Sequence, residues 1–118
     1  MTASHSLPEL QSTIERLFQA GAEAQNDPAA MTAFLTLRQA LEKGEIRSAS
    51  PDATSPTGWR VNAWVKQGIL LGFRLGALRD LPAGGLSFID KHTYPVRHFS
   101  ETDGVRVVPG GSSIRSGA

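Results

Sequence analysis

Residues 58–76, with the sequence GWRVNAWVKQGILLGFRLG, form the most apolar stretch of the chain. Asn62 is a suitable N-cap, and a helix over 63–75 would carry apolar side chains around most of its circumference. Such a helix packs on several sides, so we expect it to be the central helix of a small core. A buried strand is the alternative, because periodicity alone does not separate the two for an apolar run.

Two pairs of residues within this stretch predict which side of the helix carries charge and where another element can approach it. Lys66 and Arg74 lie on one helical edge, from which both long side chains can reach water. We expect these cations to be structural or to pack against a neighbouring subunit. Gly68 and Gly72 weaken a helix but allow another element to approach closely.

Two further helices are predicted before this stretch. Ser6 and Glu9 form the S-x-x-E pattern of a capping box, and apolar residues then recur at three- and four-residue steps, which predicts a helix over 7–24. Asp27 and Pro28 favour a second start, with a helix over 28–43 that ends at Gly44. We expect the two helices to pair as a hairpin.

The remaining segments predict short strands. An edge strand is expected over Glu45–Ala49, and the turn-forming residues 50–58 predict a β-hairpin with a long mobile loop that resumes at Trp59–Val61. Further strands are expected at Leu86–Ile89 and Val105–Val108. The fold class is therefore α+β: a helix hairpin, a buried third helix and short strands.

Size and charge exclude several classes of protein. A chain of 118 residues suits one compact domain, and a net charge of +1 gives no field for attracting nucleic acid. The absence of cysteine excludes disulfide scaffolds, thiol chemistry and cysteine-based zinc sites. No apolar run is long enough to cross a membrane and the first residues lack a secretory pattern, so we expect a cytoplasmic protein.

Few residues suggest a metal, cofactor or nucleotide site. His5, His92 and His98 form no helical pair with ligand spacing, so no metal site is expected. No phosphate-binding glycine pattern occurs, and no bound cofactor is expected. Trp59 and Trp64 are interpreted as core and lid residues rather than as a stacking platform for a ligand.

Four short motifs carry a resemblance to a known family. The first combines Trp59, Trp64 and Lys66 with the apolar residues up to Arg74; the others are LEKGEIRSA at 41–49, FIDK at 88–91, and GVRVVPG at 104–110 followed by IRSGA. In this order and spacing they resemble the N-terminal domain of bacterial tetrahydrodipicolinate N-succinyltransferases.

The resemblance implies an acyltransferase of lysine and diaminopimelate synthesis, which transfers succinyl from the co-substrate succinyl-CoA to a dicarboxylate. It also implies a homotrimer whose main body is a left-handed β-helix of hexapeptide repeats. On this basis we expect an N-terminal α+β domain over 1–103 and the start of the β-helix over 104–118, with Val108 and Ile114 in its first rung. The rest of that β-helix is absent from this sequence.

One site residue follows from the resemblance. Arg106, in GVRVVPG, matches the arginine with which the family binds its dicarboxylate substrate, and a guanidinium suits a carboxylate because it offers paired donors. Without the resemblance, an arginine between valines on a strand is read as an outward, solvated residue.

No catalytic residue is expected within this chain, because the family's acyl-CoA groove and its acidic catalytic residue belong to the β-helix. We therefore expect a fragment of the enzyme that is inactive alone. A freestanding binding or assembly module derived from this domain is the alternative, and an unrelated helical adaptor is a third possibility.

Overall fold

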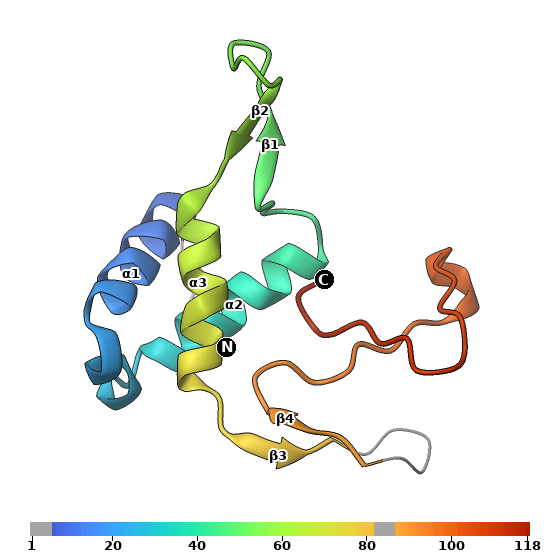
Figure 1. Ribbon diagram of the computed structural model, residues 1–118. Coiled ribbons are helices and arrows are strands. Elements are labelled where there is room, and N and C mark those ends of the chain that lie inside the picture. Colours follow the sequence, from blue (N-terminus) through green and yellow to red (C-terminus); the bar gives the residue numbers. More distant parts are fainter. Residues whose placement is uncertain (1–5, 82–86) are drawn as a thin grey trace.

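The computed structural model describes residues 6–81 and 87–118, and it has the predicted α+β class. The helices are α1 (Leu7–Gln19), the short 3₁₀ helix η1 (Gly21–Asn26), α2 (Ala30–Glu42), α3 (Ala63–Leu75) and the 3₁₀ turn η2 (Glu101–Asp103). Helices α1 and α2 contact each other, and α3 packs against both (Figure 1). The prediction of a helical hairpin with a central third helix is confirmed.

The core lies where these three helices meet. Its largest fully buried side chains are Leu10, Ile14 and Leu17 of α1, Phe34 and Leu37 of α2, and Val65 and Leu71 of α3. Each helix therefore contributes one apolar stripe, and burial of these stripes is the main force that holds the helices together.

Gly68 and Gly72 lie at the two closest contacts of α3. A Cβ atom at position 68 would stand 2.1 Å from Leu37 Cδ2, and one at position 72 would stand 2.2 Å from Phe34 Cε1. A side chain at either position would have to push Leu37 or Phe34 aside, so the predicted close approach is confirmed.

The outer face of α3 is less buried than the sequence predicted. Leu70 is 43% exposed and Phe73 is 45% exposed, and Lys66 on the same face is also exposed. The prediction that α3 is buried around most of its circumference was therefore wrong. The helix packs on the sides that face α1 and α2 and leaves a third side partly open.

The helix boundaries differ from the prediction at two places. The first helix ends at Gln19, not at residue 24, because Gly21 adopts a left-handed conformation with φ of 63° and the chain continues as η1. The second begins at Ala30, and its N-cap residue Ala29 has no side-chain cap. Asp27 instead accepts a hydrogen bond from the N–H of Ala29 at 2.9 Å, within the turn before the helix. Ser6 caps α1 and Gly44, with φ of 75°, ends the second helix, as predicted.

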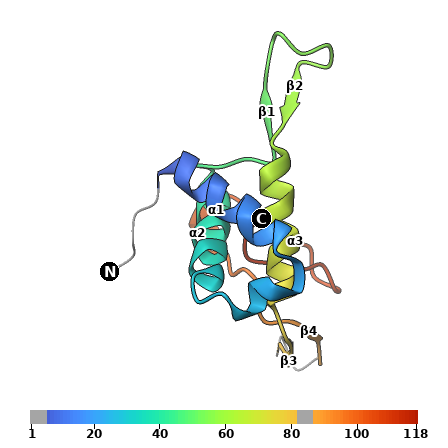
Figure 2. The same cartoon turned by 90° about the vertical axis from the view of Figure 1, so that its left-hand side faces the viewer.

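Two antiparallel hairpins stand at opposite ends of α3 (Figures 1 and 2). Strand β1 (Ala49–Pro51) pairs with β2 (Trp59–Val61), with Ser50 opposite Arg60. The predicted hairpin is confirmed, but the expected strand over 45–49 is wrong except at Ala49. Ile46 is instead buried beside the end of α2, where its N–H and that of Glu45 bond to Ala40 O.

The second hairpin joins β3 (Leu78–Asp80) to β4 (Ile89–Lys91). The strand expected over 86–89 is therefore shifted toward the C-terminus, and Leu86 lies outside the described residues. The strand expected over Val105–Val108 does not form, and these residues are exposed. No helix in the described ranges has the length and apolar character to cross a membrane.

Arg74 points toward α1 and not along the edge shared with Lys66. Its Nη1 donates to Phe18 O at 3.1 Å and to Gly21 O at 3.5 Å, and its guanidinium lies 5.1 Å from the Phe18 ring centre. The Phe18 carbonyl lies in the last turn of α1, and the Gly21 carbonyl lies at the start of η1. The predicted structural role of Arg74 is confirmed, and the expected solvated position is wrong.

We expect Arg74→Ala to lower the free energy of unfolding by about 1–3 kcal/mol, because it leaves partly buried carbonyls without a donor and removes the ring contact. Urea unfolding followed by circular dichroism measures the change. Lys66→Ala on the exposed face is the matched control, and it should change stability by no more than about 0.5 kcal/mol. Equal losses in the two variants would contradict this role for Arg74.

Candidate functional site

Arg106 lies on an irregular loop near the C-terminal end of the described chain. We call residues 98–113 the Arg106 loop; it leaves the helical body, passes through η2 and returns toward α2 (Figure 1). Ser100 and Asp103 form a capping box around η2, and Gly104 follows in a left-handed conformation with φ of 70°. A local hydrogen-bond network therefore shapes the first part of the loop.

The Arg106 side chain is exposed and makes no hydrogen bond, ion pair or ring contact with any residue in the described ranges. Its neighbours Val105, Val107 and Val108 are also exposed, at 42%, 42% and 62%. The segment that carries the predicted site residue thus presents one unpaired cation among three apolar side chains.

The two ends of the Arg106 loop are tied to each other by backbone bonds. Arg97 N donates to Ile114 O at 2.8 Å, Ser116 N donates to Pro95 O at 2.8 Å, and Val96 forms an antiparallel bridge with Arg115. The loop therefore begins and ends at one place on the body.

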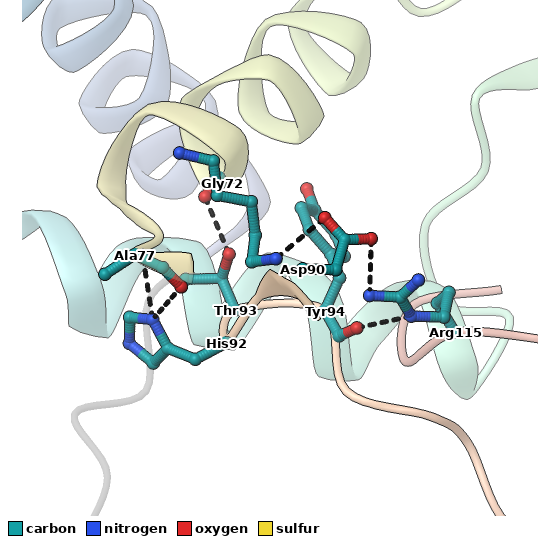
Figure 3. Close-up of polar contacts among 8 residues, drawn as sticks. Gly72, Ala77, Asp90, His92, Thr93, Tyr94 and Arg115 are labelled. Atoms are coloured by element: carbon teal, nitrogen blue, oxygen red, sulfur yellow. Dashed lines mark hydrogen bonds and ion pairs between the residues drawn. The ribbon is translucent and has the colours of Figure 1, made fainter. Parts of the chain in front are cut away.

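Arg115 connects the joined ends of the Arg106 loop to β4. Its Nη2 lies 2.8 Å from Asp90 Oδ2, and its Nε donates to Tyr94 O at 2.6 Å (Figure 3). The N–H of Lys91 donates to Asp90 Oδ1, and this bond together with Arg115 holds the pKa of the Asp90 carboxyl below its usual value. Asp90 is therefore a fixed anion that orients the guanidinium.

The last residue of β4 and the two residues at 93 and 94 bond to the C-terminal part of α3. Thr93 Oγ1 donates to Gly72 O at 2.8 Å, Tyr94 OH donates to Ile69 O at 2.6 Å, and Lys91 Nζ donates to Gly76 O at 3.1 Å. Gly72 O and Gly76 O lie at the C-terminal end of the helix, where a cation is also favoured by the helix dipole, whereas Ile69 O lies one turn earlier. Gly72 O also accepts the N–H of Gly76, so the Thr93 hydroxyl adds a second donor to it. Burial raises the pKa of Tyr94 to about 12, so its hydroxyl stays protonated and remains a donor.

Of the histidines, one makes a hydrogen bond near the end of α3 and none forms a metal site with its neighbours in the described ranges. His92 Nδ1 accepts a hydrogen bond from Ala77 N at 2.9 Å, beside the start of β3 (Figure 3). His98 is exposed, and His5 lies outside the described residues. Across residues 6–81 and 87–118, no three acidic, histidine or cysteine side chains gather where they could hold a metal ion.

Two cavities lie near the ends of the Arg106 loop. The first, of about 200 Å³, is lined by Leu81, Phe88, Val96, Gly111, Ser112, Ser113 and Arg115. The second, of about 300 Å³, lies between α2, α3 and the last residues, with Arg38, Leu41 and Tyr94 in its wall. Arg106 lines neither cavity, so its guanidinium faces solvent.

The tryptophans are placed differently from each other. Trp64 is partly buried and packs against the core, as predicted. Trp59 is 48% exposed on the β1–β2 hairpin, with the Arg47 guanidinium 5.9 Å from its ring centre.

The helical part of the chain matches a known protein family. The model of the tetrahydrodipicolinate N-succinyltransferase N-terminal family matches residues 9–75, from the first turn of α1 to the last residue of α3. The chain belongs to this family. The resemblance seen in the sequence motifs is thereby confirmed, and the family is one of N-succinyltransferases.

Curated relatives extend the match into the Arg106 loop. An enzyme of Granulibacter bethesdensis named 2,3,4,5-tetrahydropyridine-2,6-dicarboxylate N-succinyltransferase is 30% identical over 115 residues, which are 96% of this chain and 40% of the relative. Proteins of the same name from Afipia carboxidovorans and Variovorax paradoxus are 37% and 36% identical, over 64% and 66% of this chain and 28% and 31% of their own lengths. The chain thus spans less than half the length of these relatives.

The match to the succinyltransferase family does not test the role of Arg106. Arg106 lies beyond the part matched by the family model, so its substrate contact remains a prediction. The contact between Asp90 and Arg115 joins two of the motifs, FIDK and IRSGA, that sequence reasoning had treated separately. Their opposite charges were visible in the sequence, but nothing in their spacing showed that they pair.

Proposed function

We propose that this chain is the substrate-side N-terminal domain of a tetrahydrodipicolinate N-succinyltransferase, in which Arg106 binds a carboxylate of the diacid substrate. The reaction joins the succinyl group of succinyl-CoA to ring-opened tetrahydrodipicolinate, giving N-succinyl-2-amino-6-oxopimelate. The match of residues 9–75 to the family supports the assignment. The observation that carries the role of Arg106 is its exposed, unpaired guanidinium within the motif GVRVVPG.

The chemistry of Arg106 suits this role. A guanidinium stays charged at all physiological pH values and presents two parallel N–H donors to a carboxylate. Because the described residues supply no internal carboxylate for Arg106, an incoming diacid displaces no existing partner. The exposed valines beside it offer apolar contact for the carbon chain of the substrate.

The chain alone is proposed to bind the diacid without catalysing acyl transfer. The family resemblance places the acyl-CoA groove and the acidic catalytic residue in the β-helix body. We assign residues 1–103 to the N-terminal domain and 104–118 to the start of the hexapeptide-repeat body. Succinyl-CoA binding, trimer formation and a cytoplasmic location are part of the same proposal.

Titration with pyridine-2,6-dicarboxylate, a stable planar analogue of the substrate, tests the role of Arg106. Two-dimensional NMR of the isotope-labelled chain detects binding even in the millimolar range. We expect Arg106→Ala to weaken binding about tenfold to a hundredfold, as loss of a charge-assisted bond does, and Arg106→Lys to weaken it less.

Arg60→Ala is the matched control, because Arg60 is also an exposed arginine but lies on the distant hairpin. It should leave the affinity unchanged. If Arg106→Ala and Arg60→Ala bind the diacid equally well, Arg106 is not a substrate ligand.

A further inference from the structure

The tip of the Arg106 loop is not held in place by packing. Val105, Val107 and Val108 are exposed, and Arg106 has no partner among the described residues. The backbone bonds at positions 95–97 and 114–116 close the loop but join its ends only to each other. The direction in which the loop presents Arg106 must therefore come from contacts between those ends and the body.

One side chain at each end makes an ion pair with the body. Arg97 Nε lies 3.3 Å from Glu42 Oε1 at the end of α2, and Arg115 Nη2 lies 2.8 Å from Asp90 Oδ2 on β4. A loop held at one point can swing about it, whereas attachment to two separate elements fixes its direction.

The second attachment is the shorter of the two ion pairs, and a hydrogen bond from Arg115 Nε to Tyr94 O accompanies it. The Arg115 guanidinium contacts Asp90 and Tyr94 O together (Figure 3). The Tyr94 hydroxyl in turn donates to Ile69 O of α3. Asp90 is held in turn by the N–H of Lys91. Planar geometry lets arginine hold two acceptors at defined angles, which a flexible ammonium does less well.

The Asp90–Arg115 contact is partly solvated. The Arg115 side chain is 31% exposed and the Asp90 side chain is 43% exposed, and ion pairs of this kind add little to overall stability. Its effect should therefore appear in the position of the loop rather than in the unfolding midpoint.

We propose that Arg115 is a positioning residue for Arg106, and that its contact with Asp90 fixes the direction in which the Arg106 loop presents its guanidinium to the diacid. This inference rests on the proposed function. Pre-ordering the loop removes part of the entropy cost of binding, so its loss lowers affinity without removing any group that touches the ligand.

Spin-label distances test the position of the loop independently of any ligand. The chain contains no cysteine, so Glu15→Cys and Val107→Cys place one label on α1 and one beside Arg106. We expect one narrow distance distribution in this background and a broad one after Arg115→Ala or Asp90→Asn. The double variant should be no broader than either single variant, because both remove the same contact.

Asp27→Asn is the matched control for Asp90→Asn. Asp27 also pairs with an arginine, Arg16 at 3.0 Å, and also accepts a backbone N–H, yet it lies at the far side of the helices. The control should leave the distances unchanged. A narrow distribution that persists in Arg115→Ala would overturn the positioning role, and urea unfolding shows whether each variant is folded.

Binding of pyridine-2,6-dicarboxylate provides the second readout. Arg115→Ala should weaken binding about three- to tenfold when Arg106 is present, and have no effect in the Arg106→Ala background. Equal weakening in both backgrounds would show that Arg115 contacts the ligand itself or acts elsewhere, and would also overturn the proposal. If Arg106→Ala has no effect on binding, the proposed substrate contact fails, while the label distances still decide whether Arg115 orients the loop.

Discussion

Gly72→Ala is expected to lower the free energy of unfolding by about 2–3 kcal/mol, although alanine is the better helix former by about 1 kcal/mol. The added methyl would stand 2.2 Å from Phe34 Cε1 and 2.4 Å from the Tyr94 hydroxyl oxygen. Phe34 is fully buried and its ring meets the Tyr94 ring edge to face at 5.3 Å, so neither can move away cheaply. The cost of overpacking therefore exceeds the gain in helix propensity.

Chemical denaturation of the Gly72→Ala variant measures this loss. Gly68→Ala is the comparison, since its methyl would meet Leu37 Cδ2, the end of a flexible side chain that can change rotamer. We expect the smaller loss at position 68. A gain in stability at position 72, as helix propensity alone would give, would show that α3 does not pack on Phe34 and Tyr94 as described.

Leu37→Ala should lower the free energy of unfolding by about 2–5 kcal/mol, the range for a large side chain removed from a tightly packed core. Leu37 is fully buried between α2 and α3 and lies directly against Gly68. Because the neighbouring helices cannot collapse fully into the space, much of the volume would remain as a cavity.

The position of Gly68 allows a specific rescue of that variant. In the Leu37→Ala background, the methyl of Gly68→Ala enters the vacated space instead of clashing. We expect Gly68→Ala to be destabilising in the original chain and stabilising, by about 1 kcal/mol, in the Leu37→Ala chain. Equal effects of Gly68→Ala in the two backgrounds would contradict the contact.

The parts of the fold that depend on local sequence were predictable. Helix α3 has the predicted bounds, with Asn62 at its N-cap position and Gly76 after its last residue, although the Asn62 side chain donates to Arg47 O and not to the helix. Gly44 ends α2 in the left-handed conformation that glycine favours. The end of the first helix was missed because the prediction of a helix over 7–24 passed through Gly21. Its position fits the helical period, but its backbone conformation ends the helix.

The failed predictions involve partners that are distant in the sequence. Val105–Val108 has high strand propensity, but within the described residues no other strand pairs with it, and propensity alone does not make a sheet. The periodicity of α3 placed Arg74 on an edge, yet its carbonyl partners at Phe18 and Gly21 become visible only when α1 is packed.

The candidate site likewise has one residue that the sequence predicted and one contact that it did not. A motif was sufficient to single out Arg106, and its contact with substrate stays a prediction. The sequence placed Asp90 only within the motif FIDK, whereas its partner is Arg115, in a different motif. Opposite charges are common along a chain, so spacing could not select this pair.

The capping of α3 by Thr93 and Tyr94 has a mechanical consequence. Peeling this segment away would leave the carbonyls of Gly72 and Ile69 without these side-chain donors. Tension on the polypeptide beyond residue 94 would therefore act on the last two turns of the central helix.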